Sequence, residues 1–486
     1  MVQTSNLLFI LSDEHRRDTA GCYGDPIART PNIDSIAARG SRFLSAYTPS
    51  PICVPARAAL ATGRWVHQTG AWDNAAPYAG KPISWHRRLR DNGHRAVSIG
   101  KLHFRATEDD NGFSEEILPL HVLEGKGDLI GMLREPPAPR GSLPALAASA
   151  GPGESHYNDY DRAITAAACR WIATEGRRAG DKPWALFVSL VRPHFPLTAP
   201  PEFYALYPPE RMPIPRLYSK DARPKHPAVA ALASVMNYDD FFDDEPAVRR
   251  AVASYYALVS FLDDNVGKIL TALETAGLTA STRVIYTSDH GDNLGCRGLW
   301  GKSVMYEESA AIPLLMAGAD IPAGWTIRTP VSLVDCYRTI LDAVGCPLSE
   351  ADEGLPSRSL LETIAGKSSR DVLSEYHAAG SITGSFMIRR GRWKYIHHVG
   401  FRPELYDLDA DPGETTDLAA RPDKEPVLAE CRAALQRICD PDAVNAEAFA
   451  DQRRRIALHG GRDAVMRFGD FSYTPAPGEN PVRVAG

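Results

Sequence analysis

Short apolar runs recur along the chain and predict the buried strands of a sheet. The runs cover residues 6–11, 95–100, 184–190, 283–288 and 312–317. Segments in which apolar residues have a helical spacing lie between these runs. This alternation is typical of an α/β domain with a largely parallel sheet.

The clearest helical pattern follows the acidic residues 243–245. Pro246 suits a first helical turn, the acidic residues suit the positive end of the helix dipole, and Gly277 is a natural stop. One face is apolar at steps of three and four, and its members are Val248, Val252, Tyr255, Val259, Leu262, Val266, Ile269 and Leu273. The spacing therefore predicts a long core helix that ends before Gly277.

Two segments, 134–155 and 197–227, are rich in proline and show no periodic pattern. Segments of this length in a compact enzyme are expected to be ordered surface excursions or lids. We expect the acidic residues between 239 and 245 to form a solvated loop and the helix cap, with metal binding as the less favoured alternative.

The pattern changes near residue 350, where strand-like pieces begin to alternate with turn residues. Such a pattern predicts a smaller α+β lobe. We therefore divide the chain into a catalytic α/β domain, residues 1–365, and a C-terminal α+β subdomain with a tail, residues 366–486.

The composition argues against nucleic acid and membrane partners. Charged residues make up 23% of the 486 residues and the formal net charge is −6, with no basic stripe to hold a nucleic acid. No apolar stretch approaches the roughly 20 residues that a membrane span needs. The N-terminal run 7–11 is short and has no basic leader, so we interpret it as a strand and not a signal peptide. The eight cysteines are scattered without a CxxC pair, which favours reduced thiols in a cytoplasmic protein.

Acidic residues and a histidine follow two of the predicted strands. Asp13 and Glu14 come after the first strand, and the run SDHGD, which contains Asp289 and His290, comes after a later one. Because ligands bind outside the carboxyl ends of strands in open α/β sheets, we expect these side chains to converge. Carboxylates and imidazole suit a divalent cation such as Ca²⁺ or Mn²⁺. Taken singly, each residue has a structural alternative as a helix cap or a core histidine.

Cationic and imidazole side chains lie at similar positions. Lys101 and His103 follow the second predicted strand, His194 follows the third, and Lys302 follows the run GLWG. Each alone could be a surface charge or a hydrogen-bonded core histidine. Together they would form an anion site with proton-transfer groups, as sulfuryl or phosphoryl transfer requires.

The run CVPARAALATGR, residues 53–64, resembles the signature of the formylglycine-dependent sulfatases, members of the alkaline phosphatase superfamily. It is accompanied in the expected order by NLLFILSDE, TPNIDSIAARG, GKLHF, RPHFP, TSDHGDNLG and ELYDLDADPGETTDLA. The resemblance implies an alkaline-phosphatase-like fold, in which helices sandwich a large, mostly parallel sheet and a smaller α+β lobe follows. It is strongest to the branch that contains choline sulfatases and phosphonate monoester hydrolases.

The resemblance implies that Cys53 is a precursor, which a formylglycine-generating enzyme oxidises to an aldehyde. One hydroxyl of the aldehyde hydrate would attack sulfur, and the second would let the sulfated intermediate collapse without attack by water on sulfur. Arg57 would hold the hydrate. One divalent metal would complete the site, with Ca²⁺ preferred and Mn²⁺ as the alternative. Its implied ligands, beside residue 53, are Asp13, Glu14, Asp289 and His290.

The resemblance also assigns roles in sulfate binding and proton transfer. Lys101 and His103 would bind the sulfate and take the proton from the second hydroxyl. His194 and Lys302 would bind the substrate and assist the leaving oxygen. Asn74 would be a further sulfate contact.

Three departures bear on the substrate. His290 is the pattern of choline sulfatases and phosphonate monoester hydrolases, whereas many arylsulfatases have Asn there. Glu14 replaces the Gln usual in those branches and adds a negative charge. The residues after Phe104 do not reproduce the Trp-rich segment expected to cage a quaternary ammonium, so choline itself is not favoured.

Three functions follow from these patterns. The first is hydrolysis of a small organic sulfate monoester. The second is a phosphonate monoester or phosphodiester hydrolase with promiscuous sulfatase activity; Lys101 and His103 argue against it, whereas Ala56 and His290 leave it open. The third is a non-catalytic binding protein on the same scaffold, in which Cys53 would remain a thiol.

The leaving-group pocket is expected to involve the proline-rich segments and the C-terminal tail, 453–481. The tail would form the pocket edge or contact a neighbouring subunit, with a loosely packed tail as the alternative. Exchange of tails would give a homo-oligomer, a dimer or a tetramer. Trp72, Phe195 and Trp300 lie next to predicted site residues and are candidates for the pocket wall or for the core.

Overall fold

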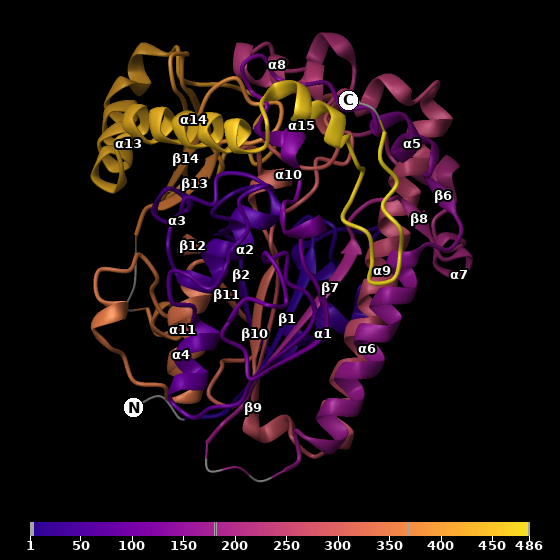
Figure 1. The fold of residues 1–486 in the computed structure, drawn as a ribbon, viewed down its shortest axis with the longest axis vertical. Coiled ribbons are helices and arrows are strands. Elements are labelled where there is room, and N and C mark those ends of the chain that lie inside the picture. The colour runs from indigo at the N-terminus through magenta and orange to yellow at the C-terminus, as the bar shows by residue number, and fades with distance from the viewer. Residues whose placement is uncertain (1–3, 179, 181, 367–369, 485–486) are drawn as a thin grey trace.

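The computed structural model describes residues 4–178, 180, 182–366 and 370–484. Its centre is an eight-stranded sheet with the strand order β11-β2-β10-β9-β1-β7-β4-β5 (Figure 1). Strand β10 is antiparallel to both of its neighbours, and the other adjacent pairs are parallel. In sheet order the strands are Trp325–Ile327, Gly40–Phe43, Leu314–Ala317, Thr282–Ser288, Asn6–Asp13, Ala185–Pro193, Ala96–Lys101 and Glu115–Leu120.

All five strands predicted from the apolar runs belong to this sheet, and the mostly parallel arrangement is confirmed. The other three strands, β2, β5 and β11, carry weaker signals. Strand β5 lies at the edge, and its sequence EEILPL is largely half-buried or exposed. Strand β2 directly follows a helix, and β11 is only three residues long. Edge position and short length therefore explain why the apolar pattern missed them.

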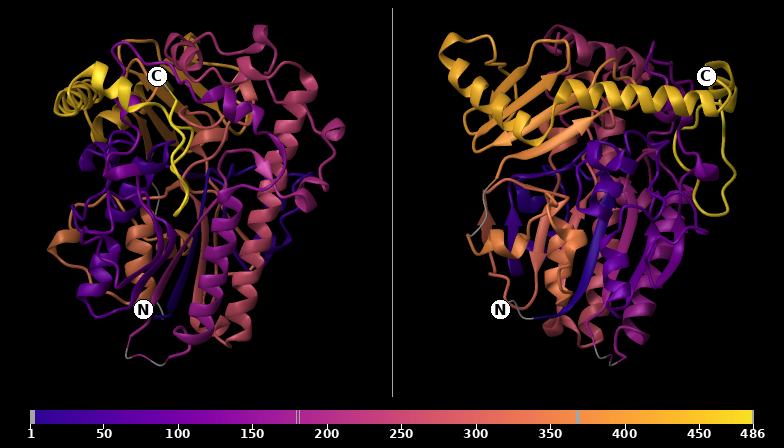
Figure 2. Two further views of the ribbon diagram at one scale, coloured as in Figure 1. Left: turned by 45° about the vertical axis from the view of Figure 1, so that its right-hand side comes forward. Right: turned by 60° about the vertical axis from the view of Figure 1, so that its left-hand side comes forward.

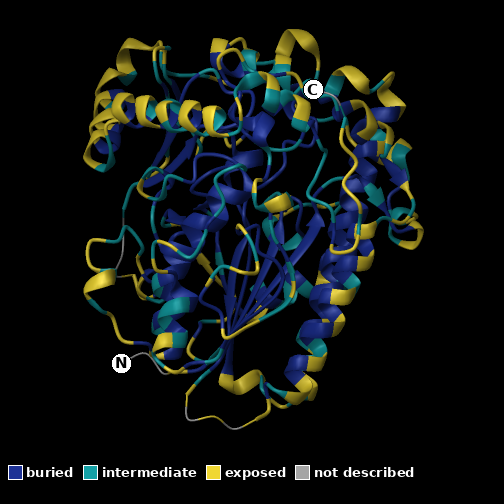
Figure 3. Cartoon of the chain, in the orientation of Figure 1, coloured by how far each residue is buried: buried dark blue, intermediate teal, exposed yellow. Residues whose placement is uncertain are grey.

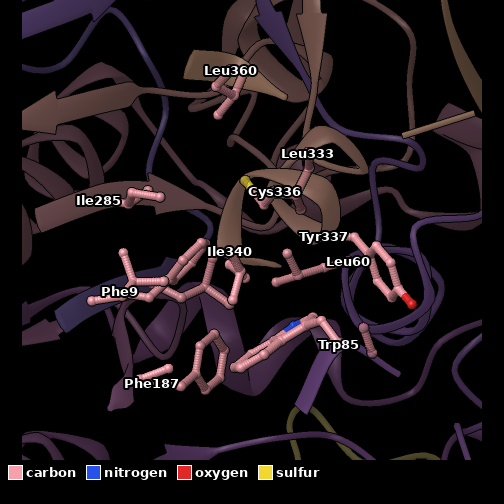
Figure 4. Close-up of a cluster of buried hydrophobic side chains, with 14 of the residues drawn as sticks. Phe9, Leu60, Trp85, Phe187, Ile285, Leu333, Cys336, Tyr337, Ile340 and Leu360 are labelled. Carbon is pink, nitrogen blue, oxygen red and sulfur yellow. The ribbon is translucent and has the colours of Figure 1, made fainter. Parts of the chain in front are cut away.

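Alternate residues of the central strand β1 enter cores on opposite faces of the sheet. Leu7, Phe9 and Leu11 pack with helices α2 (Cys53–Thr62), α4 (Trp85–Asp91) and α11 (Asp335–Val344). Figure 4 shows this core, where Phe9 and Phe187 of the sheet meet Trp85 and Ile340 of the helices.

Leu8 and Ile10 pack on the other face with helices α1 (Pro31–Arg39), α6 (His156–Thr174) and α9 (Glu245–Thr275). The sheet is therefore buried from both sides, as Figure 3 shows by its dark blue strands.

Helix α9 matches the long core helix that the spacing predicts. It begins after Asp244, whose Oδ1 accepts a hydrogen bond from the backbone N–H of Ala247 at 2.8 Å. It ends at Thr275, two residues before Gly277 with its φ of 73°. The acidic segment before the helix agrees with the expectation in part: Asp244 is the cap and Asp243 is exposed, whereas Asp239 lies in a short 3-10 helix (Tyr238–Phe241) and pairs with Arg223.

The C-terminal lobe is a four-stranded antiparallel sheet with helices packed against it (Figure 2). Its elements are β13 (Val372–Tyr376), β14 (Ser385–Arg390), β15 (Trp393–His398), β16 (Glu404–Asp407), α13 (Glu425–Ile438) and α14 (Pro441–Leu458). This confirms the smaller α+β lobe, whereas a boundary between residues 365 and 366 stays a prediction. After α15 (Arg462–Phe468), the tail leaves the lobe and runs back along the main domain (Figure 1).

The proline-rich segments are ordered excursions that pair with each other. Segment 134–155 contains α5 (Leu143–Ala148) and β6 (Gly151–Pro152), and segment 197–227 contains β8 (Thr198–Ala199) and α7 (Pro201–Tyr204). Strands β6 and β8 are parallel neighbours. Among the described residues, no helix is both long and apolar enough to cross a membrane.

Candidate active site

The carboxyl ends of four neighbouring strands meet at one edge of the sheet. Asp13 ends β1, Lys101 ends β4, His194 follows β7, and Asp289 follows β9. None of these four side chains is more than 4% exposed. The structure therefore brings together groups that are far apart in sequence, and their roles can be examined from their contacts.

Cys53 is the first residue of α2 and is 1% exposed. Its Sγ lies 3.2 Å from His290 Nε2 and 3.6 Å from Asp13 Oδ1. Burial, followed by the negative charge of Asp13, raises the pKa of the Cys53 thiol to about 12. A thiol that stays protonated at neutral pH is a poor nucleophile, so the surroundings of Cys53 do not favour thiolate chemistry.

Two groups of potential metal-ligand atoms, each within 4.8 Å of one another, share Asp13. They are Asp13 with Cys53, Asp289 and His290, and Asp13 with Glu14 and His194. Among the described residues, Glu14 Oε1 is buried and has no hydrogen-bond partner. A buried carboxylate oxygen without a donor is costly unless a cation satisfies it. The set of carboxylates and imidazole therefore fits the divalent ion that the sequence predicts.

Arg57 connects two of these carboxylates. Its Nε donates to Asp289 Oδ2 at 2.8 Å, and its Nη2 donates to Asp13 Oδ2 at 3.0 Å. Its Nη1 donates to the carbonyl of Lys101 at 2.7 Å and to Ser189 Oγ at 2.9 Å. These contacts orient the two acidic side chains, and a contact of Arg57 with an aldehyde hydrate stays a prediction.

Two lysines lie beside the carboxylates. Lys101 Nζ is 2.6 Å from Asp13 Oδ2, and Lys302 Nζ donates to Glu14 Oε2 at 2.9 Å. Burial raises the pKa of Glu14 to about 8, although Lys302 opposes the change. Burial alone would lower the pKa of Lys302, but electrostatic coupling to the ionisable groups of Cys53, Glu14 and Asp13 outweighs it and raises that pKa. Lys302 therefore stays protonated and adds positive charge next to residue 53.

Two histidines complete the group around residue 53. His194 Nε2 lies 3.4 Å from Glu14 Oε2, and His103 Nε2 lies 3.1 Å from Thr474 Oγ1. Burial, together with nearby lysines, lowers the pKa of both imidazoles well below the ordinary value. Both rings are therefore neutral at pH 7 and are able to accept a proton.

Asn74 lies in a loop that the C-terminal lobe fixes. Its Oδ1 accepts a hydrogen bond from the backbone N–H of Val54 at 3.1 Å. The preceding Asp73 is buried and accepts from Gln452 Nε2 at 2.7 Å and from Arg455 Nη2 at 2.9 Å, both on α14. Asn74 is therefore held next to the start of α2, where a role in sulfate binding stays a prediction.

A cavity opens beside Cys53. Part of its wall comes from residues 140–146 and from the tail residues 470–474. Its aromatic lining consists of Phe195, Tyr238, Trp300, Phe471 and Tyr473. The expectation that the tail and segment 134–155 border the pocket agrees with this wall.

One expectation about the pocket is wrong, and one open alternative is decided. Within the described residues, segment 197–227 provides none of the lining, because it packs on α9, with the Phe203 ring 5.5 Å from that of Phe261. Of the two alternatives for Trp72, core packing is confirmed, because its ring is buried against the C-terminal lobe, 5.3 Å from that of His377.

Sequence reasoning missed several polar groups of the pocket. The Arg140 guanidinium donates to Asp128 Oδ1 and to Asp470 Oδ1, both at 2.8 Å. Thr474 contacts His103, as described above, and burial raises the pKa of Asp292 to about 6 next to the metal-binding candidates. Asp292 could have been found from its place in SDHGD, whereas Arg140, Asp470 and Thr474 lie in segments without motif or period.

Comparison with known proteins decides the family. Residues 5–346 match the family model described as sulfatase. The chain belongs to the sulfatase family. A second model, described as N-sulphoglucosamine sulphohydrolase, C-terminal, matches residues 295–440 of this sulfatase. The protein is thus an enzyme of the sulfuric ester hydrolase class, and sulfatases generally use a metal ion and a formylglycine.

Its relatives include enzymes named for different substrates. The choline-sulfatase of Rhizobium meliloti (strain 1021) is 30% identical over 466 residues, which cover 93% of this chain and 90% of that protein. The arylsulfatase K of Homo sapiens is 29% identical over 444 residues, which cover 86% of this chain and 79% of that protein.

Solved structures confirm the fold. A structure in complex with its substrate D-glucosamine-2-N,6-O-disulfate has a TM-score of 0.74 at 21% identity, covering 92% of this chain and 99% of that chain. The phosphonate monoester hydrolase of Agrobacterium radiobacter has a TM-score of 0.70 at 23% identity, covering 91% of this chain and 96% of that chain. At this level of identity, the likeness concerns the fold alone.

Proposed function

We propose that this sulfatase hydrolyses a small organic sulfate monoester by means of a formylglycine made from Cys53 and one divalent metal ion. The observation that carries the proposal is the position of Cys53. Its Sγ lies 3.2 Å from His290 Nε2 and is one of four donor atoms that lie within 4.8 Å of one another. The high pKa of its thiol supports a precursor rather than a working thiolate.

The chain's own residues would divide the work as follows. Asp13, Glu14, Asp289 and His290 would hold the metal, with Ca²⁺ preferred and Mn²⁺ as the alternative. When formed, the aldehyde hydrate would supply a nucleophilic hydroxyl and a second hydroxyl that allows sulfate to leave.

Lys101 and Lys302 would neutralise the sulfate oxygens, because both ammonium groups lie beside the carboxylates around residue 53. His103 would accept a proton, and His194 would assist the leaving oxygen together with Lys302. His103 is suited to accept a proton because burial keeps it neutral. Asn74 would hold one sulfate oxygen.

The cavity supports a leaving group with apolar surface. Its aromatic lining includes Phe195 and Trp300. The Arg140 guanidinium in its wall is already paired with Asp128 and Asp470, so it offers no free positive charge to a carboxylate of the substrate. Because the residues after Phe104 lack the Trp-rich segment expected to cage a quaternary ammonium, we expect an aryl or alkyl sulfate to be a better substrate than choline sulfate.

The alternative activity is hydrolysis of phosphonate monoesters or phosphodiesters, with sulfatase as a side reaction. Two observations keep this candidate open. One is the presence of His290, and the other is the fold that the chain shares with a phosphonate monoester hydrolase. The presence of both Lys101 and His103 in the site favours the sulfate ester.

The test is to compare kcat/KM for an aryl sulfate and an aryl phosphonate monoester on one preparation of known aldehyde content. Each tenfold preference corresponds to about 1.4 kcal/mol of transition-state stabilisation. A strong sulfate preference supports the proposal, and a phosphonate preference contradicts it.

Three further parts of the proposal concern the setting of the enzyme. A formylglycine-generating enzyme would be the partner that modifies residue 53. The cytoplasmic location is inferred from the scattered cysteines, which contain no CxxC pair. The dimer or tetramer is inferred from the C-terminal tail, which could be exchanged between subunits. Both stay predictions.

A further inference from the structure

The C-terminal tail reaches the imidazole of His103. His103 is 5% exposed, lines the same cavity as Cys53, and has a φ of 55°. Its Nε2 lies 3.1 Å from Oγ1 of Thr474, which is 371 positions away in sequence. Within the described part of the chain, its Nδ1 is buried without a hydrogen-bond partner. One ring nitrogen is therefore held by the tail, and the other is unengaged.

Contacts independent of His103 fix the position of Thr474. Tyr157 on α6 donates its hydroxyl to the carbonyl of Thr474 at 2.6 Å. The ring of the adjacent Tyr473 lies 4.8 Å from the ring of Tyr157, and the Tyr473 hydroxyl donates to Glu479 at 2.9 Å. The hydroxyl of Thr474 is thus presented to the histidine by an anchored segment.

A second anchor lies at the base of the same segment. Asp470 pairs with Val484 as an antiparallel bridge, so the tail turns back on itself. Asp470 also accepts hydrogen bonds from Arg140 at 2.8 Å and from Ser142 Oγ at 2.7 Å, both in the proline-rich segment. The tail is therefore fastened on both sides of Thr474.

We infer that Thr474 is a positioning residue for His103: its hydroxyl accepts a hydrogen bond from Nε2–H and thereby fixes the ring orientation and the tautomer. This leaves Nδ1 unprotonated as the atom that accepts a proton. The inference rests on the role proposed above for His103. A histidine whose second nitrogen is held by a fixed partner keeps a defined tautomer, and loss of such a partner in other enzymes lowers activity.

The first test replaces the hydroxyl of Thr474 with a methyl group of similar size. Thr474→Val is expected to lower kcat by about tenfold or more with little change in KM, because the substrate is still bound while the base is misdirected. Thr474→Ser, which keeps the hydroxyl, is expected to restore most of the rate. Thr326→Val, an exposed threonine on the edge strand β11, is the matched control and is expected to match the wild type.

The second test combines the change with His103→Ala. If Thr474 acts only through His103, Thr474→Val has no further effect in the His103→Ala background. Independent, multiplicative losses, or a Thr474→Val variant as active as wild type, would overturn the inference. If Thr474→Val does not fold, Tyr157→Phe, which removes the hydrogen bond to the Thr474 carbonyl, must also lower kcat and must have no further effect in the His103→Ala background.

The design separates this inference from the proposed function. A His103→Ala variant that is as active as the wild type would refute the role given to His103. A sensitive His103 with an insensitive Thr474 would refute only the positioning role.

Discussion

At the scale of single residues, the active site contains buried acidic groups that need a cation. Glu14 is fully buried, and among the described residues its Oε1 has no hydrogen-bond partner. Removing its charge should weaken cation binding, because the number of carboxylates tunes the affinity of such sites.

We therefore predict that Glu14→Gln weakens Ca²⁺ binding by about tenfold or more. Calorimetric titration of the metal-free protein with Ca²⁺ measures this directly. In the wild type, Ca²⁺ should raise the melting temperature and a chelator should reverse the rise, since an ion that binds only the folded state stabilises it. The exposed Asp423→Asn is the control. Unchanged Ca²⁺ affinity in Glu14→Gln would show that Glu14 is not a ligand.

Four of the site residues found from sequence share one property, which is their position at strand ends, whereas Cys53 and Arg57 were found from a motif on α2. Asp13, Lys101, His194 and Asp289 could be predicted because parallel strands deliver their carboxyl ends to one edge. Thr474 and Arg140 could not, because they act through tertiary contacts from irregular segments whose composition carries no period. Tail residues of this kind become visible only once the chain is folded.

At the scale of elements, helix α9 holds the loop after β1, which contains the proposed metal ligand Glu14. The Tyr255 hydroxyl donates to the carbonyl of Glu14 at 2.7 Å and accepts from the backbone N–H of Arg16 at 2.9 Å. Glu14 itself has a φ of 69°, a conformation that a non-glycine residue adopts only when its surroundings impose it.

Tyr255→Phe should therefore lower activity several-fold while costing about 1 kcal/mol or slightly more in the free energy of unfolding. Steady-state rates at increasing Ca²⁺ concentration and urea unfolding provide the two measurements. Tyr204→Phe on the peripheral helix α7 is the matched control. Equal rates for Tyr255→Phe and wild type at every Ca²⁺ concentration would argue against a supporting role for α9.

Strand β16 contributes a carboxylate that links pH to stability. Burial would raise the pKa of Glu404, but hydrogen bonds from His398 and Tyr406 and the charge of His398 lower it from 4.5 to about 2. A carboxylate with a depressed pKa stabilises the fold above its unfolded value and loses that contribution as the pH falls. The lost stability should amount to about 3 kcal/mol between pH 4.5 and 2.

Glu404→Gln should accordingly be less stable than wild type at pH 7 and show a shallower loss of stability below pH 4.5. Urea midpoints measured across this range test the expectation, with Asp423→Asn as an exposed control. Parallel pH curves for wild type and Glu404→Gln would contradict the assignment.

The same scale shows how far pattern reasoning extends. The buried strands and α9 were predictable because their apolar residues repeat with a period over several turns or positions. Strands β2, β5 and β11 were not, since each is short or lies near the sheet edge and is defined by its neighbours rather than by its own sequence.

At the scale of the whole molecule, a buried ion cluster joins the lobe to the main domain. Lys394 on β15 is fully buried, and its Nζ lies 3.0 Å from Glu307 Oε1 and 2.8 Å from Glu414 Oε1. Glu307 starts α10 (Glu307–Ala310) of the main domain and also pairs with Arg17 at 2.9 Å. Removing the lysine would leave buried negative charge without its partner.

We predict that Lys394→Met lowers the free energy of unfolding by about 3–5 kcal/mol. Equilibrium unfolding in urea measures the loss, and Lys268→Met, an exposed lysine paired with Asp264 on α9, is the matched control. A Lys394→Met variant as stable as the control would show that the cluster does not hold the lobe.

Catalysis by this enzyme is proposed to depend on an aldehyde made from Cys53, and this dependence can be measured. Preparations that differ in aldehyde content at residue 53, as determined by peptide mass spectrometry, are assayed for hydrolysis of an aryl sulfate. The rate per enzyme molecule should rise in proportion to the aldehyde fraction and vanish for the pure thiol form and for Cys53→Ala. A preparation that carries only the thiol and yet turns over the sulfate ester at the full rate would contradict this dependence.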